Sequence, residues 1–151
     1  MKTVNEMRLD FRSRPENEAL ARMVISAFMM PVNPTLEQLG DVKTAVSEAV
    51  TNAIVHGYRD RKGLVRMRAW LQEDGELLIE VCDKGCGIEN VAQARQPFFT
   101  TMEGSERSGM GFTVMESFMD GVAVRSAPEK GTVVHMVKRL GAAETVSARR
   151  A

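Results

Sequence analysis

Apolar residues at helical spacing, between Val42 and Ile54, constrain the fold of this chain more than any other feature. Residues three and four positions apart lie on one face of an α-helix, so the pattern predicts a helix with one buried side. We expect Gly57 to end this helix in the left-handed conformation that glycine adopts readily. The apolar stripe consists of Val42, Ala45, Val46, Ala49, Val50, Ala53 and Ile54.

Three polar residues, Glu48, Asn52 and His56, follow one edge of that stripe at intervals of four. They therefore project from the same side of the predicted helix. A carboxylate and a carboxamide one turn apart beside a buried face can serve a metal-bound ligand, and the small side chains of Ala45 and Ala49 leave room for it. A solvated edge of a core helix gives the same pattern, so the helix alone does not decide between the two.

Length and charge exclude several classes of protein. The 151 residues suffice for one domain, with 20 acidic and 20 basic residues and hence no overall field that attracts nucleic acid or an anionic membrane. There is no apolar run of membrane-spanning length and no signal-peptide pattern. Cys82 and Cys86 lack the further ligands of a zinc site, and we expect them to be reduced thiols in a cytoplasmic protein. We expect residues 1–140 to form one domain and residues 141–151 a disordered tail.

The N-terminal part predicts a strand and then a helix. Met7, Leu9 and Phe11 alternate with charged residues, as in a half-buried strand. Ser13–Glu16 then resembles a capping box that opens a helix. The core side of this helix is predicted to be Leu20, Met23, Val24, Ala27 and Phe28. Its other side carries Ala21, Ile25 and Met29 around Arg22, so the helix is either buried on both sides or presents a partner or dimer surface.

The rest of the chain predicts an α+β domain. Thr35–Gln38 has the pattern of a second capping box, which opens the long helix. Alternating apolar residues predict strands over 65–71 and 77–81, joined by a hairpin turn at Glu73–Gly75, and a final strand pair around 122–124 and 133–137. Short helices are expected at 91–96 and after Gly111, the latter with Phe112, Met115 and Met119 buried.

Asp83 stands at the end of a predicted strand and is followed by Gly85 and Gly87. A carboxylate there accepts a hydrogen bond from the exocyclic amine of adenine, and the glycines let the backbone approach the ring. A polar turn with glycines in left-handed conformation is the alternative interpretation.

Residues 108–111, Ser-Gly-Met-Gly, precede a predicted helix. Free backbone amides and the helix dipole favour phosphate at such a position, and Arg107 adds a cation. No Walker P-loop is present. Thr132, just inside the final strand, has a hydroxyl within reach of a base.

Four motifs, in their order along the chain, resemble the ATP-binding site shared by gyrase, Hsp90, histidine kinases and MutL. They are Glu48 with Asn52, Asp83-x-Gly85-x-Gly87, Gly109-x-Gly111 and Gly131-Thr132. The fold that this implies is a two-layer α+β sandwich of the Bergerat type, with a mixed, largely antiparallel sheet covered on one face by helices. Segments 47–58, 94–97 and 106–113 are more closely similar to the sporulation anti-sigma F factors. That resemblance extends from about Asn5 to Lys138.

The resemblance implies a serine kinase that uses ATP and Mg²⁺. Asn52 would hold Mg²⁺, and Glu48 would be the base that accepts the serine proton. Asp83 would select adenine, with Gly85, Gly87 and Thr132 around the base. The phosphates and the adjacent loop would be contacted by Thr100, Thr101, Arg107, Ser108, Gly109, Met110 and Gly111.

The resemblance also implies protein partners. A member of this family binds a sigma factor of the sigma-F type in its ATP state and inhibits transcription, and it phosphorylates an anti-anti-sigma factor on serine. Arg22 matches a partner-contacting arginine, and a homodimer would give Ile25 and Met29 a role at its surface. No direct contact with nucleic acid or membrane is expected.

Three alternatives remain open at this stage. One is a kinase of the anti-sigma B type, which acts in stress response with the same chemistry. Another is a non-catalytic, ATP-gated sigma-binding module, against which the presence of Glu48 argues. The third is a detached histidine-kinase ATPase domain, for which His56 and His135 are poor phosphoacceptor candidates.

Overall fold

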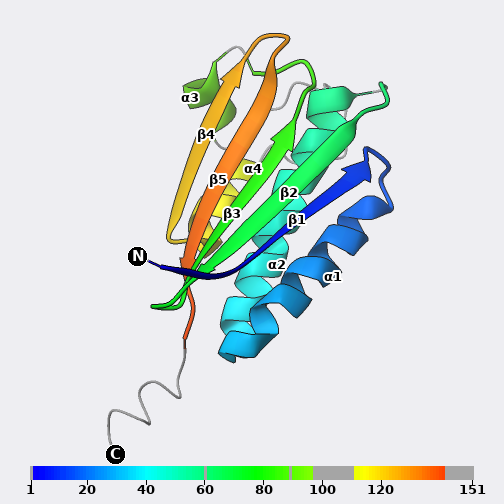
Figure 1. Ribbon diagram of the computed structural model, residues 1–151. Coiled ribbons are helices and arrows are strands. Elements are labelled where there is room, and N and C mark those ends of the chain that lie inside the picture. Colours follow the sequence, from blue (N-terminus) through cyan, green and yellow to red (C-terminus); the bar gives the residue numbers. More distant parts are fainter. Residues whose placement is uncertain (1, 60, 89, 97–110, 142–151) are drawn as a thin grey trace, which may run out of the picture.

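The computed structural model describes residues 2–59, 61–88, 90–96 and 111–141 (Figure 1). Among these residues, the strands form one five-stranded sheet in the order β1-β2-β3-β5-β4. The strands are β1 (Thr3–Arg12), β2 (Leu64–Gln72), β3 (Glu76–Asp83), β4 (Gly121–Ala127) and β5 (Gly131–Arg139). The helices are α1 (Asn17–Met29), η1 (Met30–Val32), α2 (Leu36–Thr51), η2 (Asn52–Tyr58), α3 (Val91–Ala94) and α4 (Gly111–Phe118).

All pairings in the described sheet are antiparallel, whereas a mixed, largely antiparallel sheet was predicted. The connection from β3 to β4 brings β4 back parallel to β3, but β5 lies between the two and is antiparallel to both. The sheet therefore contains a crossover without a parallel ladder. The predicted α+β class and two-layer arrangement are confirmed.

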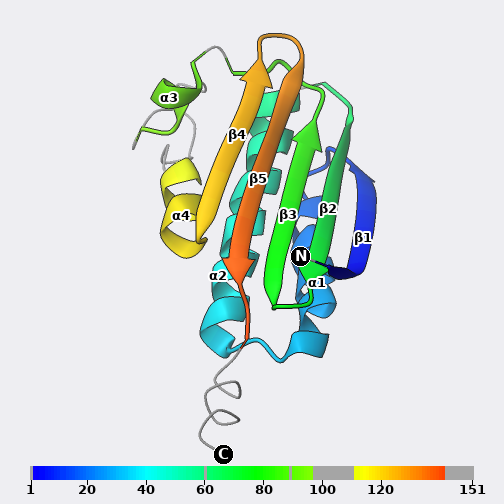
Figure 2. The same ribbon diagram turned by 60° about the vertical axis from the view of Figure 1, so that its left-hand side comes forward.

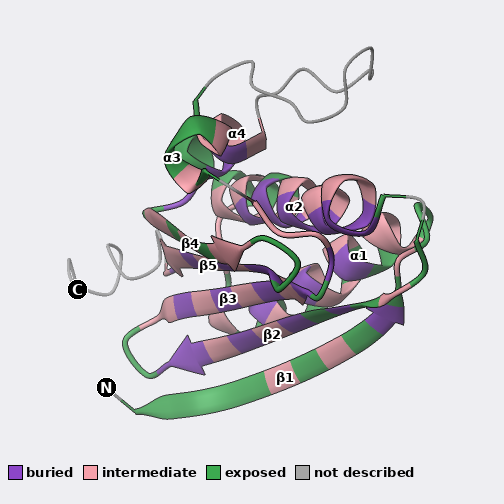
Figure 3. Ribbon diagram, turned by 90° about the horizontal axis from the view of Figure 1, so that it is seen from above, coloured by how far each residue is buried: buried purple, intermediate pink, exposed green. Residues whose placement is uncertain are grey.

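Helices α1, α2 and α4 lie together on one face of the sheet, and no helix of the described residues lies on the other face (Figures 2 and 3). Alternation along the strands matches this arrangement, because β2 buries Val65, Met67, Ala69 and Leu71 while its charged residues point the other way. The open face holds ion pairs and the Arg68 guanidinium, 4.7 Å from the centre of the Trp70 ring.

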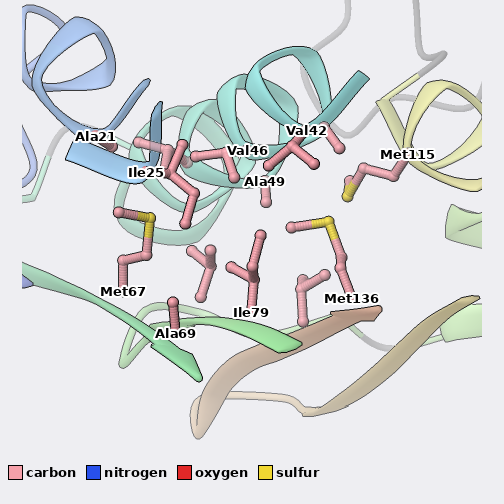
Figure 4. Packing of buried hydrophobic residues seen from close by; sticks show 14 of the residues in the cluster. Ala21, Ile25, Val42, Val46, Ala49, Met67, Ala69, Ile79, Met115 and Met136 are labelled. Atoms are coloured by element: carbon pink, nitrogen blue, oxygen red, sulfur yellow. The ribbon is translucent and has the colours of Figure 1, made fainter. Parts of the chain in front are cut away.

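The core lies between the two layers, and the predicted stripe of α2 is entirely buried in it. Val42, Val46 and Ala49 of α2 point toward Met67, Ala69, Ile79 and Met136 of the sheet, with Met115 of α4 at one side (Figure 4). The capping box that opens α2 is also confirmed, because Thr35 Oγ1 accepts from Gln38 N at 3.0 Å and Gln38 Oε1 accepts from Thr35 N at 3.0 Å. Within the described residues, no helix combines the length and apolarity needed to cross a membrane.

The predicted core face of α1 is only partly correct, because Val24 and Phe28 pack half-buried against the core but Leu20, Met23 and Ala27 are exposed. Ala21, Ile25 and Met29 are fully buried, whereas Met23 is 72% exposed and Leu20 is 41% exposed. Both sides of the helix have apolar residues at helical spacing, so periodicity did not distinguish them. Since Ile25 and Met29 pack inside the chain, they are not surface contacts for a partner or a second copy.

The predicted capping box at Ser13 is also absent, and α1 begins at Asn17 without a side-chain cap. The Ser13 hydroxyl instead accepts from Gly63 N at 3.0 Å, and Asn17 Nδ2 donates to Arg12 O at 2.9 Å. The first contact joins the residue after β1 to the residue before β2, and the second joins the start of α1 to the end of β1. The orientation of α1 is therefore fixed by tertiary contacts that its own sequence does not reveal.

The orientation of α1 predicts different effects for two apolar truncations. Ile25→Ala should lower the free energy of unfolding by about 2–5 kcal/mol, because it leaves a cavity in the core. Met23→Ala should change it by no more than about 0.5 kcal/mol, because that side chain is largely in water. Urea denaturation of both variants measures the difference. Equal losses, or a larger loss for Met23→Ala, would contradict this orientation.

Candidate functional site

The helix that carries Glu48 and Asn52 continues beyond its expected end. After α2, the chain forms the π-helical turn η2 from Asn52 to Tyr58, and the residue with positive φ is Arg59, at 54°, rather than Gly57. Gly57 is needed for another reason. A Cβ at this position would lie 2.7 Å from Asp83 Oδ1. The glycine therefore lets the helix approach the end of β3, and π turns are frequent at functional sites.

The loop after β3 packs directly on the end of η2. Cys86 N donates to Gly57 O at 2.8 Å. A Cβ on Gly85 would lie 2.0 Å from that same oxygen, so no larger residue fits there without a backbone shift. The Tyr58 hydroxyl adds a second link, because it donates to Leu64 O at 2.6 Å and accepts from Lys84 N at 2.8 Å. Sequence reasoning gave Tyr58 no part in the site, since a single tyrosine in a turn has no distinctive pattern.

Asp83 lies at the centre of this contact and is only 7% exposed. Its Oδ1 accepts from Gly85 N at 2.9 Å. Burial raises the pKa of Asp83 to about 6, and this effect outweighs the amides of Gly85 and Thr132 and the charge of Arg61, which lower it. The carboxylate is thus desolvated yet held by backbone donors, which suits it to accept a hydrogen bond from a ligand.

Thr132 faces Asp83 across the β3–β5 ladder and is 8% exposed. Gly131, just before it, has φ +86°, and a Cβ there would lie 2.1 Å from Asp83 O. Gly87 has φ +77° and lies against the carbonyl of Ala127, where a Cβ would be 1.9 Å away. The predicted base-binding residues therefore come together at one end of the sheet.

Glu48 and Asn52 are half-buried at the junction of α2 and η2. Asn52 lies beside the first residue of α4, because a Cβ on Gly111 would be 3.1 Å from its Nδ2 and 3.2 Å from its Oδ1. The structure thus brings the carboxamide next to the N-terminus of α4, as predicted for Gly111. Six further residues that were predicted to bind nucleotide lie outside the described residues. They are Thr100, Thr101, Arg107, Ser108, Gly109 and Met110.

Arg22 is the one predicted partner contact that remains at the surface, with 42% of its side chain exposed. Its Nε pairs with Glu18 Oε2 at 2.8 Å, and the Ser47 hydroxyl donates to the same carboxylate. Ser47 directly precedes Glu48, so this network joins α1 to the helix that carries the candidate base.

The described residues contain no group of three or more His, Cys, Asp or Glu side chains able to hold a metal ion. Cys82 and Cys86 are both free thiols. Asn52 offers one oxygen at the site, so a cation there would take most of its ligands from the bound molecule and water. That donor set fits Mg²⁺ carried by phosphates.

Comparison with known proteins agrees with this geometry. The histidine kinase-like ATPase domain family matches residues 11–138. Among solved structures, the RsbU and RsbW domains of Rv1364c from Mycobacterium tuberculosis superpose with a TM-score of 0.67 at 19% identity, covering 91% of this chain and 33% of that one. The mycobacterial sensor histidine kinase MprB gives a TM-score of 0.55 at 18% identity, covering 89% of this chain and 97% of that one. At these identities the superpositions show a shared fold.

The relatives found by sequence have a much higher identity to this chain than these solved structures have. The anti-sigma F factor of Thermoanaerobacter sp. (strain X514) is 49% identical over 141 residues, which is 93% of this chain and 98% of the relative. That of Clostridium acetobutylicum is 51% identical over 140 residues, 93% of this chain and 97% of the relative. With its fold and nearly its whole length matched, this chain belongs to the anti-sigma F factor family, a branch of the histidine kinase-like ATPase domains.

Proposed function

We propose that this protein is an ATP-dependent serine kinase that also binds and inhibits a sigma factor of the sigma-F type. Its protein substrate in this proposal is an anti-anti-sigma factor, phosphorylated on serine. Membership of the anti-sigma F factor family supports the assignment. The observation that carries it is the buried carboxylate of Asp83, held by a backbone amide at the end of β3 and enclosed by glycines.

Asp83 and Thr132 supply the base-binding end. An ionised carboxylate only accepts hydrogen bonds, so Asp83 pairs with the exocyclic amine of adenine. Gly57, Gly85 and Gly131 support this role, since side chains at these positions would collide with Asp83 or with the neighbouring backbone. The base therefore meets a surface made largely of main chain.

Asn52 and the N-terminus of α4 supply the phosphate end. Gly111, the first residue of α4, lies beside the Asn52 carboxamide, and a helix N-terminus favours anionic groups. In this proposal the Asn52 oxygen is a ligand of the Mg²⁺ that accompanies ATP. When bound, the cation neutralises charge on the phosphates.

Glu48 lies one turn before Asn52 on the same edge of the helix. In our proposal its carboxylate accepts the proton of the substrate serine hydroxyl. The serine oxygen bonds to the terminal phosphorus of ATP as the bond from that phosphorus to the bridging oxygen breaks, and ADP leaves. A well-placed base of this kind contributes on the order of 10²–10⁴-fold to the rate. The remaining acceleration comes from positioning and charge neutralisation.

The proposed partner surface is the outward side of α1. Arg22 is exposed there, and Leu20 and Met23 supply apolar area in place of the buried Ile25 and Met29. A homodimer is part of the same proposal on the family resemblance alone. Light scattering of the purified protein tests it, and a monomer at all concentrations would exclude it.

Glu48→Gln tests the catalytic role. It should reduce transfer of phosphate from ATP to the antagonist by about 100-fold or more while leaving ATP affinity within about threefold, because the base acts in the transition state. Transfer of labelled phosphate and calorimetry measure the two quantities. Glu37→Gln, an exposed change in the first turn of the same helix, is the matched control.

Phosphate transfer at the wild-type rate by Glu48→Gln would disprove the role of Glu48. ATP binding by the wild-type protein without any transfer would instead favour the non-catalytic sigma-binding module.

Asn52→Asp tests the phosphate end. The added carboxylate faces the phosphates, so ATP affinity should fall by about tenfold in the presence of Mg²⁺. Calorimetric titration with ATP and Mg²⁺ measures the change, and the folded state is checked by urea denaturation. An unchanged affinity would argue against the position assigned to the nucleotide.

The pKa of Asp83 predicts a pH dependence of binding. Below the pKa of about 6 the carboxyl is protonated in the free protein, and bound adenine requires the ionised form. Affinity for Mg²⁺-ADP should therefore be constant above pH 7 and fall toward acid pH, by at most about tenfold per pH unit. Titrations between pH 5 and 8 measure this change, and constant affinity down to pH 5 would contradict the role of Asp83.

A further inference from the structure

Ser126 belongs to the site, although neither its sequence context nor the family resemblance singled it out. It lies on β4 opposite Thr132 of β5, and Thr132 in turn lies opposite Asp83 of β3. The three residues therefore form one row across three neighbouring strands. They lie on the same face of the sheet as the core residues Val81 and Val134, two positions along their strands.

The hydroxyl of Ser126 has three partners. It accepts from Ile88 N at 2.8 Å and donates to Gly131 O at 2.9 Å. Its third contact is Thr132 Oγ1 at 2.8 Å, for which the donor is not fixed by distance. A serine hydroxyl carries one hydrogen, and here the Gly131 carbonyl takes it. The hydrogen between the two side chains must then come from Thr132.

This assignment determines what Thr132 offers to a ligand. Its own hydrogen is used by Ser126, so its oxygen presents only lone pairs toward the base. Asp83, when ionised, is likewise an acceptor only. Two acceptors side by side favour the 6-amino group of adenine, which has two hydrogens to donate. The 6-oxo group of hypoxanthine would place its own lone pairs against them.

We propose that Ser126 is a positioning residue that sets the base preference of this site. By taking the Thr132 hydrogen, it keeps the Thr132 oxygen an acceptor and thereby favours a 6-amino purine over a 6-oxo purine. This inference rests on the proposed ATP binding and deepens it. Ser126 acts through Thr132 and contacts neither the phosphates nor the reacting atoms.

The test compares the affinities of Mg²⁺-ATP and Mg²⁺-ITP. Their bases differ in the 6-amino against the 6-oxo group and also at N1, which is an acceptor in adenine and carries a hydrogen in hypoxanthine. In Ser126→Ala the Thr132 hydroxyl is released and can turn its hydrogen toward a 6-oxo group. The ratio of ATP to ITP affinity should therefore fall by about 3–10-fold relative to wild type, the effect of one hydrogen bond. Ser126→Thr retains the hydroxyl on a strand that tolerates β-branched residues, and it should keep the wild-type ratio.

A Thr132→Val background separates this role from a merely structural one. Without the Thr132 hydroxyl, adding Ser126→Ala should not change the ratio further. If Ser126→Ala lowers both affinities equally, or if its effect on the ratio persists with Val at position 132, Ser126 is only structural and the inference is wrong. If the wild-type protein binds ATP but does not discriminate against ITP, the inference fails while the proposed function stands. If the wild-type protein takes up neither nucleotide, both fail.

Discussion

The backbone contact between Gly57, near the end of η2, and Gly85, in the loop after β3, is the constraint on which the site depends. It joins the helix that carries Glu48 and Asn52 to the strand that carries Asp83. Any side chain at either glycine would separate the two layers at this point. Because the contact is tight, Asp83 is buried, and burial is what raises its pKa. The position of the helix and the electrostatics of the carboxylate therefore have a single cause.

Elements with one clear periodicity were predictable from sequence. The stripe of α2, the capping box at Thr35 and the alternation in β2 and β3 each have one interpretation, and the structure confirms them. Helix α1 is apolar on two sides, and the chain at its start is held by contacts of Ser13 with Gly63, which is distant in sequence, and of Asn17 with the end of β1. The described sheet has no parallel ladder because β5 lies between β3 and β4, and no local sequence pattern predicts that position of β5.

The site was predictable where chemistry and spacing are distinctive. Asp83 with its two glycines, Thr132 after Gly131, and Asn52 and Gly111 were each expected at one nucleotide site, and they lie close enough together for that, while their ligands stay a prediction. Gly57 was expected to end a helix and instead permits close packing. Tyr58 and Ser126 were missed, because a lone tyrosine and a strand serine become informative only when their partners are known. Residues that position others have little signal of their own in a single sequence.

The most direct test of the account is a crystal structure of the protein with Mg²⁺ and a non-hydrolysable ATP analogue. We expect the exocyclic amine of adenine about 3 Å from the Asp83 carboxylate, and the Asn52 side-chain oxygen about 2.1 Å from the cation. A nucleotide bound elsewhere on the chain, or bound here with Asp83 making no contact to the base, would contradict it.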